Sequence, residues 1–168
     1  MRFIRFVPTS FFAACEHTWP GSWIRHGQWT FAITETFHIM ALGMLLGTIV
    51  VLDLRLLGLG PWKQSSSEFA SDLLGWTWAA FALMVLTGVP LFMSEAQRLG
   101  KSGPFFYKMM FLVVALVVQA MIFGINSGRG AALSGRTGKV LGALSLLSWL
   151  GVALAGRAIA FPFLLAQH

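Results

Sequence analysis

Four long apolar runs, separated by short polar segments, dominate the pattern of hydrophobic positions along the chain. A bilayer core about 30 Å thick takes roughly 20 helical residues to cross. The runs therefore predict four membrane-spanning helices at about residues 29–52, 69–93, 104–125 and 140–164. Short connections make successive helices antiparallel neighbours. We expect an all-α fold, an integral membrane four-helix up-down bundle formed by one domain over residues 29–168.

Residues 1–28 form an N-terminal segment with a different pattern, in which aromatic side chains are mixed with polar groups. Between residues 9 and 27 the chain is too polar to span a membrane, so the pattern predicts one or two short amphipathic helices that lie in the interface. Pro20-Gly21 is expected to break them. The tryptophans of this region are expected at headgroup level: Trp19, Trp23 and Trp29.

The composition supports a membrane environment. Of the 168 residues, 57% are hydrophobic and 11% are charged, which is more apolar surface than a water-soluble domain of this size needs. The lipid bilayer is therefore an expected partner. The net charge of +6 is spread over the polar connections, so no nucleic-acid binding is expected. Cys15 is the single cysteine, which excludes an internal disulfide and a cysteine-rich metal centre.

Ionisable residues occur inside the predicted spans, where they are costly and by default mark a functional site or a buried polar contact. Antiparallel threading places the starts of the first and third spans at the same depth as the ends of the second and fourth. The ionisable groups gather at these ends: Glu35, His38, Glu95, Lys108 and Arg157. At about 100° per residue, Glu35 and His38 fall in one sector of the first span. The sequence therefore predicts one polar layer to which all four helices contribute.

Two ion pairs are predicted in this layer, Glu35 with Arg157 and Glu95 with Lys108, because pairing is how charges are normally tolerated in a membrane. Such pairs also have a purely structural interpretation, in which they fix the register of the helices. Lys108 has a structural interpretation of its own, in which its long side chain extends the ammonium group to the headgroups.

His38 has two interpretations. An intramembrane imidazole hydrogen-bonds a carboxylate, or it serves as an axial ligand of haem iron. In the second case His38 is the metal ligand of a haem b, and Met93 lies at the right depth for a second ligand. Glu35, Arg157 and Lys108 then orient the imidazole or pair with the haem propionates. No second histidine occurs within the predicted spans, so the common pair of histidine ligands is absent.

Two other functions fit the pattern. Gly43 and Gly47 form a GxxxG pair in the first span, which permits close approach of another helix. Together with the tryptophan-rich N-terminal segment, this pair favours a non-catalytic accessory subunit of a larger membrane complex. A copper-handling component would use His38 and methionine ligands, although the eight methionines do not cluster at ligand spacing. The substrate, the redox partner and the oligomeric state stay open.

The first span is expected to end at Asp53-Leu54-Arg55. Basic residues are almost evenly divided between the two sides of the predicted bundle. An aromatic interfacial segment is more typical of the outer face, so both termini are expected outside the cytoplasm.

Most of the chain shows a resemblance to a known family. The stretches that carry it are ETFHIMALGMLLGTIVVLDLRLLG, WTWAAFALMVLTGVPLFMSEA, FYKMMFLVVAL and LSWLGVALAGRAIAF. Over nearly all of residues 20–165, the chain resembles an uncharacterised family of small bacterial inner-membrane proteins. The resemblance implies a four-helix fold in the bacterial inner membrane, with the termini then in the periplasm. It implies no established activity.

More distantly, the chain is similar to the haem-b membrane protoporphyrinogen oxidases and to the copper-resistance D membrane proteins. The similarity to the oxidases lies at His38, Arg55 and Lys108, and it implies that His38 is a haem ligand and Lys108 a functional partner. The chain departs from the oxidases at the end of the first span, where Pro-Arg is missing. It departs from the closer family at Phe123-Gly124-Ile125, where members often have a histidine.

Overall fold

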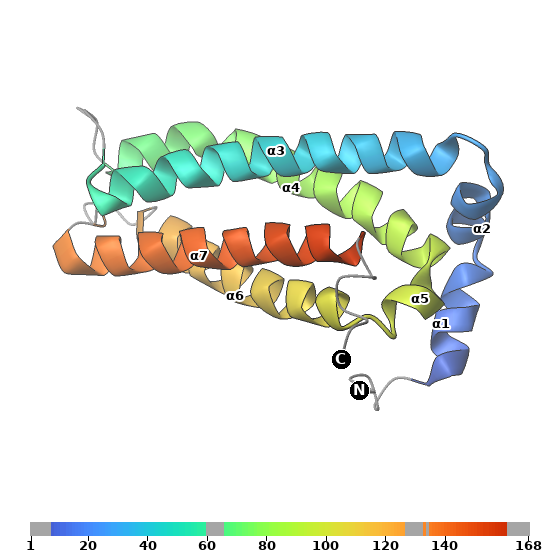
Figure 1. Cartoon of the computed structure of the whole chain (residues 1–168). Coiled ribbons are helices and arrows are strands. Elements are labelled where there is room, and N and C mark those ends of the chain that lie inside the picture. The colour runs from blue at the N-terminus through green and yellow to red at the C-terminus, as the bar shows by residue number, and fades with distance from the viewer. Residues whose placement is uncertain (1–7, 60–65, 127–132, 134, 161–168) are drawn as a thin grey trace.

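The structure is a computed structural model that describes residues 8–59, 66–126, 133 and 135–160. These residues form helices, and no strand occurs among them (Figure 1). In chain order the helices are α1 (Thr9–Glu16), α2 (Trp19–His26), α3 (Thr30–Leu57), α4 (Ser66–Ser94), α5 (Ala96–Leu99), α6 (Gly103–Asn126) and α7 (Gly135–Ile159). The predicted all-α class is confirmed.

Four of the described helices, α3, α4, α6 and α7, are long and apolar enough to cross a membrane. They correspond to the four predicted spans and make this a multi-pass membrane fold. The prediction that the first span ends at Asp53-Leu54-Arg55 is wrong. Good helix formers continue α3 to Leu57, and it closes at Gly58, whose φ of 78° is the left-handed conformation that glycine adopts without strain. Asp53 therefore lies inside a span.

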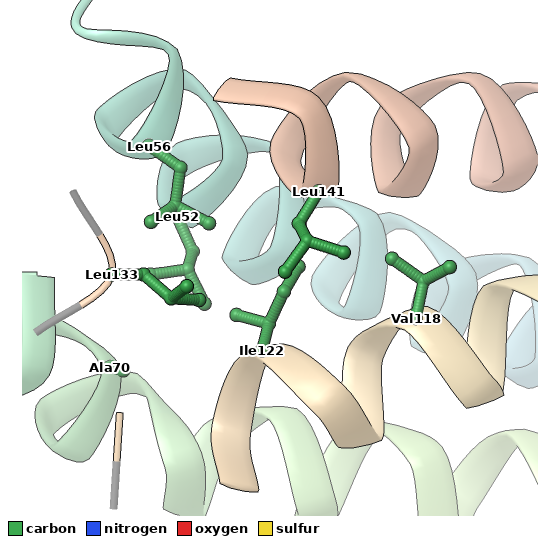
Figure 2. Close-up of a cluster of buried hydrophobic side chains, with 7 residues drawn as sticks. All are labelled: Leu52, Leu56, Ala70, Val118, Ile122, Leu133 and Leu141. Carbon is green, nitrogen blue, oxygen red and sulfur yellow. The ribbon is translucent and has the colours of Figure 1, made fainter. Parts of the chain in front are cut away.

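The long helices lie side by side as a bundle, with α3 along α4 and α6 along α7 (Figure 1). Contacts between α3 and α7 join the two pairs. One apolar cluster packs near the end of α3 (Figure 2) and consists of Leu52, Leu56, Ala70, Val118, Ile122, Leu133 and Leu141. A second cluster fills the middle of the bundle and consists of Leu45, Ile49, Ala80, Ala115, Trp149 and Val152.

The outer surface of the bundle is apolar as well. Leu86, Leu147 and Leu154, on α4 and α7, are 71%, 63% and 62% exposed. Large apolar surfaces of this kind are a liability in water. A lipid bilayer accommodates them, because the backbone groups of the spans are already paired within their own helices.

Helices α1 and α2, together called the N-terminal cap, lie at one end of the bundle beside α5 and the end of α4 (Figure 1). The predicted short helices are present, but the predicted break at Pro20-Gly21 is wrong. The chain turns at His17 and Thr18, and Pro20 occupies the first turn of α2. Proline is tolerated there because the first-turn N–H groups have no partner within the helix.

Candidate functional site

His38 projects from α3 toward α4, where its imidazole is half-buried. The Nδ1 atom of His38 lies 2.9 Å from the hydroxyl oxygen of Thr87. That hydroxyl donates its one proton within α4, to the carbonyl oxygen of Leu83 at 2.7 Å. Thr87 is therefore an acceptor toward the imidazole, so Nδ1 carries the proton of the neutral ring. The Nε2 atom of His38 is left with a free lone pair.

Gly88 makes room for this imidazole. A Cβ atom added at Gly88 would lie 2.9 Å from the Cε1 atom of His38 and 3.4 Å from its Nδ1. Carbon atoms do not approach this closely, so any larger residue would displace the ring. The packing of Gly88 and the hydrogen bond of Thr87 together fix the orientation of His38.

Lys108 lies half-buried between α6 and α7. Its Cε and Nζ atoms are 3.8 and 3.9 Å from the position of a Cβ atom at Gly156. The predicted pair of Lys108 with Glu95 is wrong, because Glu95 instead forms an ion pair with Arg98. The helix is interrupted between α4 and α5, and this turns Glu95 toward the residue that follows it by one turn.

The predicted ion pair between Glu35 and Arg157 is also wrong. Both side chains are exposed, and no ion pair joins these two described residues. His38 follows Glu35 by three positions, which is about 300° around the helix, so the two side chains point in directions about 60° apart. Glu35 is therefore directed out of the bundle while His38 faces α4. The predicted role of Glu35 and Arg157 at a cofactor stays a prediction.

Met93 lies at the end of α4 that packs against the N-terminal cap. Its carbonyl oxygen is 2.9 Å from the position of a Cβ atom at Gly21 in α2. Five residues separate Met93 from Gly88, a rise of about 7.5 Å along the helix. Its predicted role as a second haem ligand stays a prediction. In the part of the chain that the structure describes, no group of three or more His, Cys, Asp or Glu residues forms a metal site.

A second polar group, which the sequence did not reveal, lies in the other half of the bundle. We call it the Asp53 cluster: Asp53 of α3, Gln119 of α6 and Ser145 of α7. Asp53 and Ser145 are completely buried, and the Ser145 hydroxyl donates to the Gln119 side-chain oxygen at 3.2 Å. Three buried atoms of the cluster have no hydrogen-bond partner: both carboxyl oxygens of Asp53 and Nε2 of Gln119.

Asp53 was missed because the predicted first span stops before it. One signal was available, since Gln119 and Ser145 are polar residues within apolar spans. Their positions bring them to the level of Asp53 once α3 is extended by a turn.

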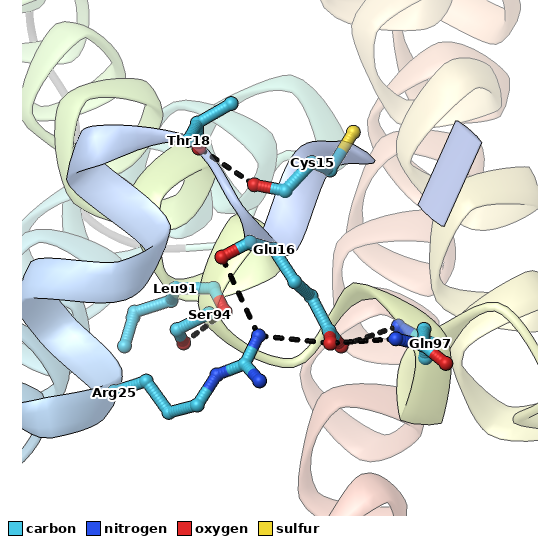
Figure 3. Close-up of polar contacts among 7 residues, drawn as sticks. All are labelled: Cys15, Glu16, Thr18, Arg25, Leu91, Ser94 and Gln97. Carbon is cyan, nitrogen blue, oxygen red and sulfur yellow. Dashed lines mark hydrogen bonds and ion pairs between the residues drawn. The ribbon is translucent and has the colours of Figure 1, made fainter. Parts of the chain in front are cut away.

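A third polar group anchors the N-terminal cap to the bundle (Figure 3). The Glu16 carboxylate accepts hydrogen bonds from the backbone N–H and the side-chain amide of Gln97, each at 2.8 Å. The Arg25 guanidinium lies 2.8 Å from the same carboxylate. The backbone N–H of Gln97 is the largest cause that holds the pKa of Glu16 below its ordinary value of 4.5, against the opposing effect of burial.

Comparison with known proteins identifies one family. The model of a family of unknown function (DUF6644) matches residues 3–162, which is most of the chain. No curated protein and no solved structure gives a significant match.

Proposed function

The chain belongs to this family of unknown function, and we propose, from the geometry around His38, that it is a membrane protein that binds haem b or a similar redox cofactor. The Nε2 atom of His38 would be the ligand to the iron. When bound, haem supplies one-electron transfer.

The hydrogen bond between His38 and Thr87 is the observation that carries the proposal. A histidine that binds a metal almost always donates its other ring N–H to a fixed acceptor, which sets the tautomer and the direction of the free nitrogen. Thr87 is such an acceptor because its own proton is used by Leu83. Gly88 supports the same orientation through packing.

Lys108 is the second residue of the proposed site. Its half-buried ammonium group lies against Gly156 of α7 and is suited to pair with an anionic group such as a haem propionate. Glu35, Arg157 and Met93 are weaker members, since the first two are exposed and Met93 lies beside α2. The proposal does not depend on these three residues.

The visible spectrum of the purified full-length chain, produced with ample haem, tests this function. We expect a Soret band that shifts on reduction and that His38→Ala abolishes. Thr87→Val keeps the ligand but removes its acceptor, so we expect haem affinity to fall about 10- to 100-fold. His17→Ala, at an exposed position of the N-terminal cap, should leave the band unchanged.

Two results of the spectroscopic test would contradict the proposed role of His38. A protein without a Soret band would rule out the proposal, and a band that survives His38→Ala would place the ligand elsewhere. Metal analysis of the same sample tests the copper-handling alternative, for which bound copper in place of haem is expected.

The main alternative is a non-catalytic accessory subunit of a larger membrane complex. One observation favours it: Gly43 and Gly47 are exposed, and a Cβ atom added at either would have no neighbour within 4 Å. The GxxxG pair is thus not used between the helices of this chain. Purification in mild detergent should then yield a stable partner that Gly47→Leu releases, whereas an isolated monodisperse monomer counts against this alternative.

For location, we propose the bacterial inner membrane with both termini in the periplasm. Four antiparallel spans place both termini on one side, together with α5 and the N-terminal cap. The cap is rich in exposed tryptophan, which suits the outer interface: Trp19, Trp23 and Trp29.

A further inference from the structure

The Asp53 cluster contains a carboxyl group with no ion-pair partner. Asp53 is completely buried, and neither of its carboxyl oxygens has a hydrogen bond of ordinary geometry. An ionised carboxylate in such surroundings is strongly disfavoured unless a cation or several donors compensate for the lost water. Unpartnered buried polar atoms of this kind call for an explanation in terms of a bound species.

Among the residues that the structure describes, the charged groups near this end of the bundle do not supply the compensation. The helices that pack around Asp53 carry Arg55 on α3, Glu68 and Asp72 on α4, and Arg136 and Lys139 on α7. All of these are exposed except Arg55, which is half-buried, and none forms an ion pair with Asp53. The two ionisable residues of α6, Tyr107 and Lys108, lie 12 and 11 positions before Gln119, at least about 16 Å along the helix.

The neighbours of Asp53 are hydrogen-bonding but uncharged. Ser145 follows Gly142 by three positions on α7, and a Cβ atom at Gly142 would lie 3.0 Å from the backbone oxygen of Asp53, so this part of α7 packs directly against Asp53. Ser145 gives its one proton to Gln119, so toward Asp53 it presents only lone pairs. An ionised Asp53 cannot bond to those lone pairs, because both groups are acceptors. A protonated Asp53 can, since its O–H would donate to Ser145.

The same three residues also have an arrangement for the ionised acid. If the Gln119 amide is turned over, its Nε2 donates to Ser145, and the Ser145 hydroxyl is then directed at the Asp53 carboxylate. This arrangement gives a partner to the Gln119 nitrogen that lacks one in the structure. Amide and hydroxyl orientations of this kind interchange by rotation alone. The cluster can therefore reverse its hydrogen bonds without moving a helix.

We propose that Asp53, Ser145 and Gln119 form a reversible proton-binding site inside the membrane domain. Proton uptake converts the Asp53 carboxylate to the carboxylic acid and reverses the direction of the Ser145–Gln119 hydrogen bond. The proton comes from the aqueous phase at the near end of the bundle. Asp53 lies four residues before the end of α3, about 6 Å along the helix, at the opposite end from the N-terminal cap.

Infrared difference spectroscopy of the full chain in lipid tests the site. We expect the carbonyl stretch of a protonated carboxylic acid that shifts on exchange into heavy water and disappears as the pH is raised. Asp53→Asn, which has nearly the same shape, should lack this band. Ser145→Ala removes the acceptor, so it should shift the band to higher frequency. Asp72→Asn, at an exposed carboxylate of α4, should leave it unchanged.

Two results would overturn the proposal. One is the absence of any band that depends on Asp53 over the whole pH range in which the protein stays folded. The other is a band, or a melting temperature, that responds to sodium or potassium at constant pH and ionic strength, which would make the cluster a metal-cation site. If Asp53→Asn does not fold, Ser145→Ala and Gln119→Leu report on the native Asp53, and an unchanged band in both contradicts the site.

Discussion

Glu16 and Asp53 are the two carboxylates that are buried in the described part of the chain, and their surroundings are opposite. Glu16 lies in the N-terminal cap and receives hydrogen bonds from Gln97 and an ion pair from Arg25. Asp53 lies among apolar side chains and uncharged polar groups. The surroundings of Glu16 stabilise a negative charge, and those of Asp53 do not. The same chemical group, a carboxyl, therefore serves as an anchor at one end of the bundle and as a proposed proton acceptor at the other.

The stability of the cap is expected to depend on pH through Glu16. Its pKa in the folded protein is lowered, so its contribution is complete above the ordinary value of 4.5 and is lost as the pH falls through the lower folded value. Glu16→Gln should cost about 1.5–3 kcal/mol at neutral pH, the usual value of hydrogen bonds to a charged group.

Thermal unfolding of wild type and Glu16→Gln between neutral and acidic pH measures this effect. The difference between the two should shrink on acidification, while Asp72→Asn, at an exposed carboxylate, should follow the wild type. A constant difference at every pH would show that the charge of Glu16 does not stabilise the cap.

At the residue scale, the sequence predicted some side-chain directions and not others. The inward direction of His38 was predicted from its sector on the first span. The outward direction of Glu35 was not, because a sector of about 60° on a helix covers both an inner and an outer face. The burial of Asp53 was not predicted for a different reason, because it depends on where α3 ends.

At the scale of helices, close packing is achieved by a glycine pair other than the predicted one. Gly43 and Gly47 of α3 are exposed, whereas Gly138 and Gly142 of α7 are buried. A Cβ atom at Gly142 would lie 3.0 Å from the backbone oxygen of Asp53. Both pairs have the same GxxxG spacing, so spacing alone does not tell which face meets another helix of the same chain.

Alanine substitution in the two glycine pairs should have different effects on stability. Gly142→Ala places a methyl group against the backbone of α3, which has no freedom to yield, so we expect a loss of about 1–3 kcal/mol in the free energy of unfolding. Gly47→Ala, with open space around it, should change stability by less than about 1 kcal/mol. Unfolding in detergent micelles measures both; equal effects would refute the close contact of α7 with α3.

At the scale of the whole molecule, His38 and Asp53 lie at two levels, and the packing between them is apolar apart from the hydrogen bond that Thr77 donates to Thr48 at 3.1 Å. His38 and Asp53 are 15 residues apart on α3, about 22 Å along the helix. The apolar cluster that contains Leu45, Ile49 and Trp149 separates them. The four spans and their antiparallel order were predictable from hydrophobic length alone. The division of the polar residues between two levels was not predictable, because it depends on which polar residues of different helices meet.

Reporter fusions test the proposed orientation of the whole molecule. Alkaline phosphatase, which is active outside the cytoplasm, should be active when fused after Lys101 and inactive when fused after Lys63 or Arg129. Fusions of a cytoplasmic reporter at the same points should give the reverse pattern. Activity of alkaline phosphatase only after Lys63 and Arg129 would invert the orientation.

The anchor between Glu16 and Gln97 also bears on how the protein is made. These residues are 81 positions apart in the chain. At about 5–20 residues per second, Gln97 leaves the ribosome roughly 4–16 s after Glu16. For most of that interval the main docking surface of the first two helices is missing, because the end of α4 and α5 have not yet been translated. The N-terminal cap is therefore translated before α3 to α7 but reaches its final position only after α5 has been made.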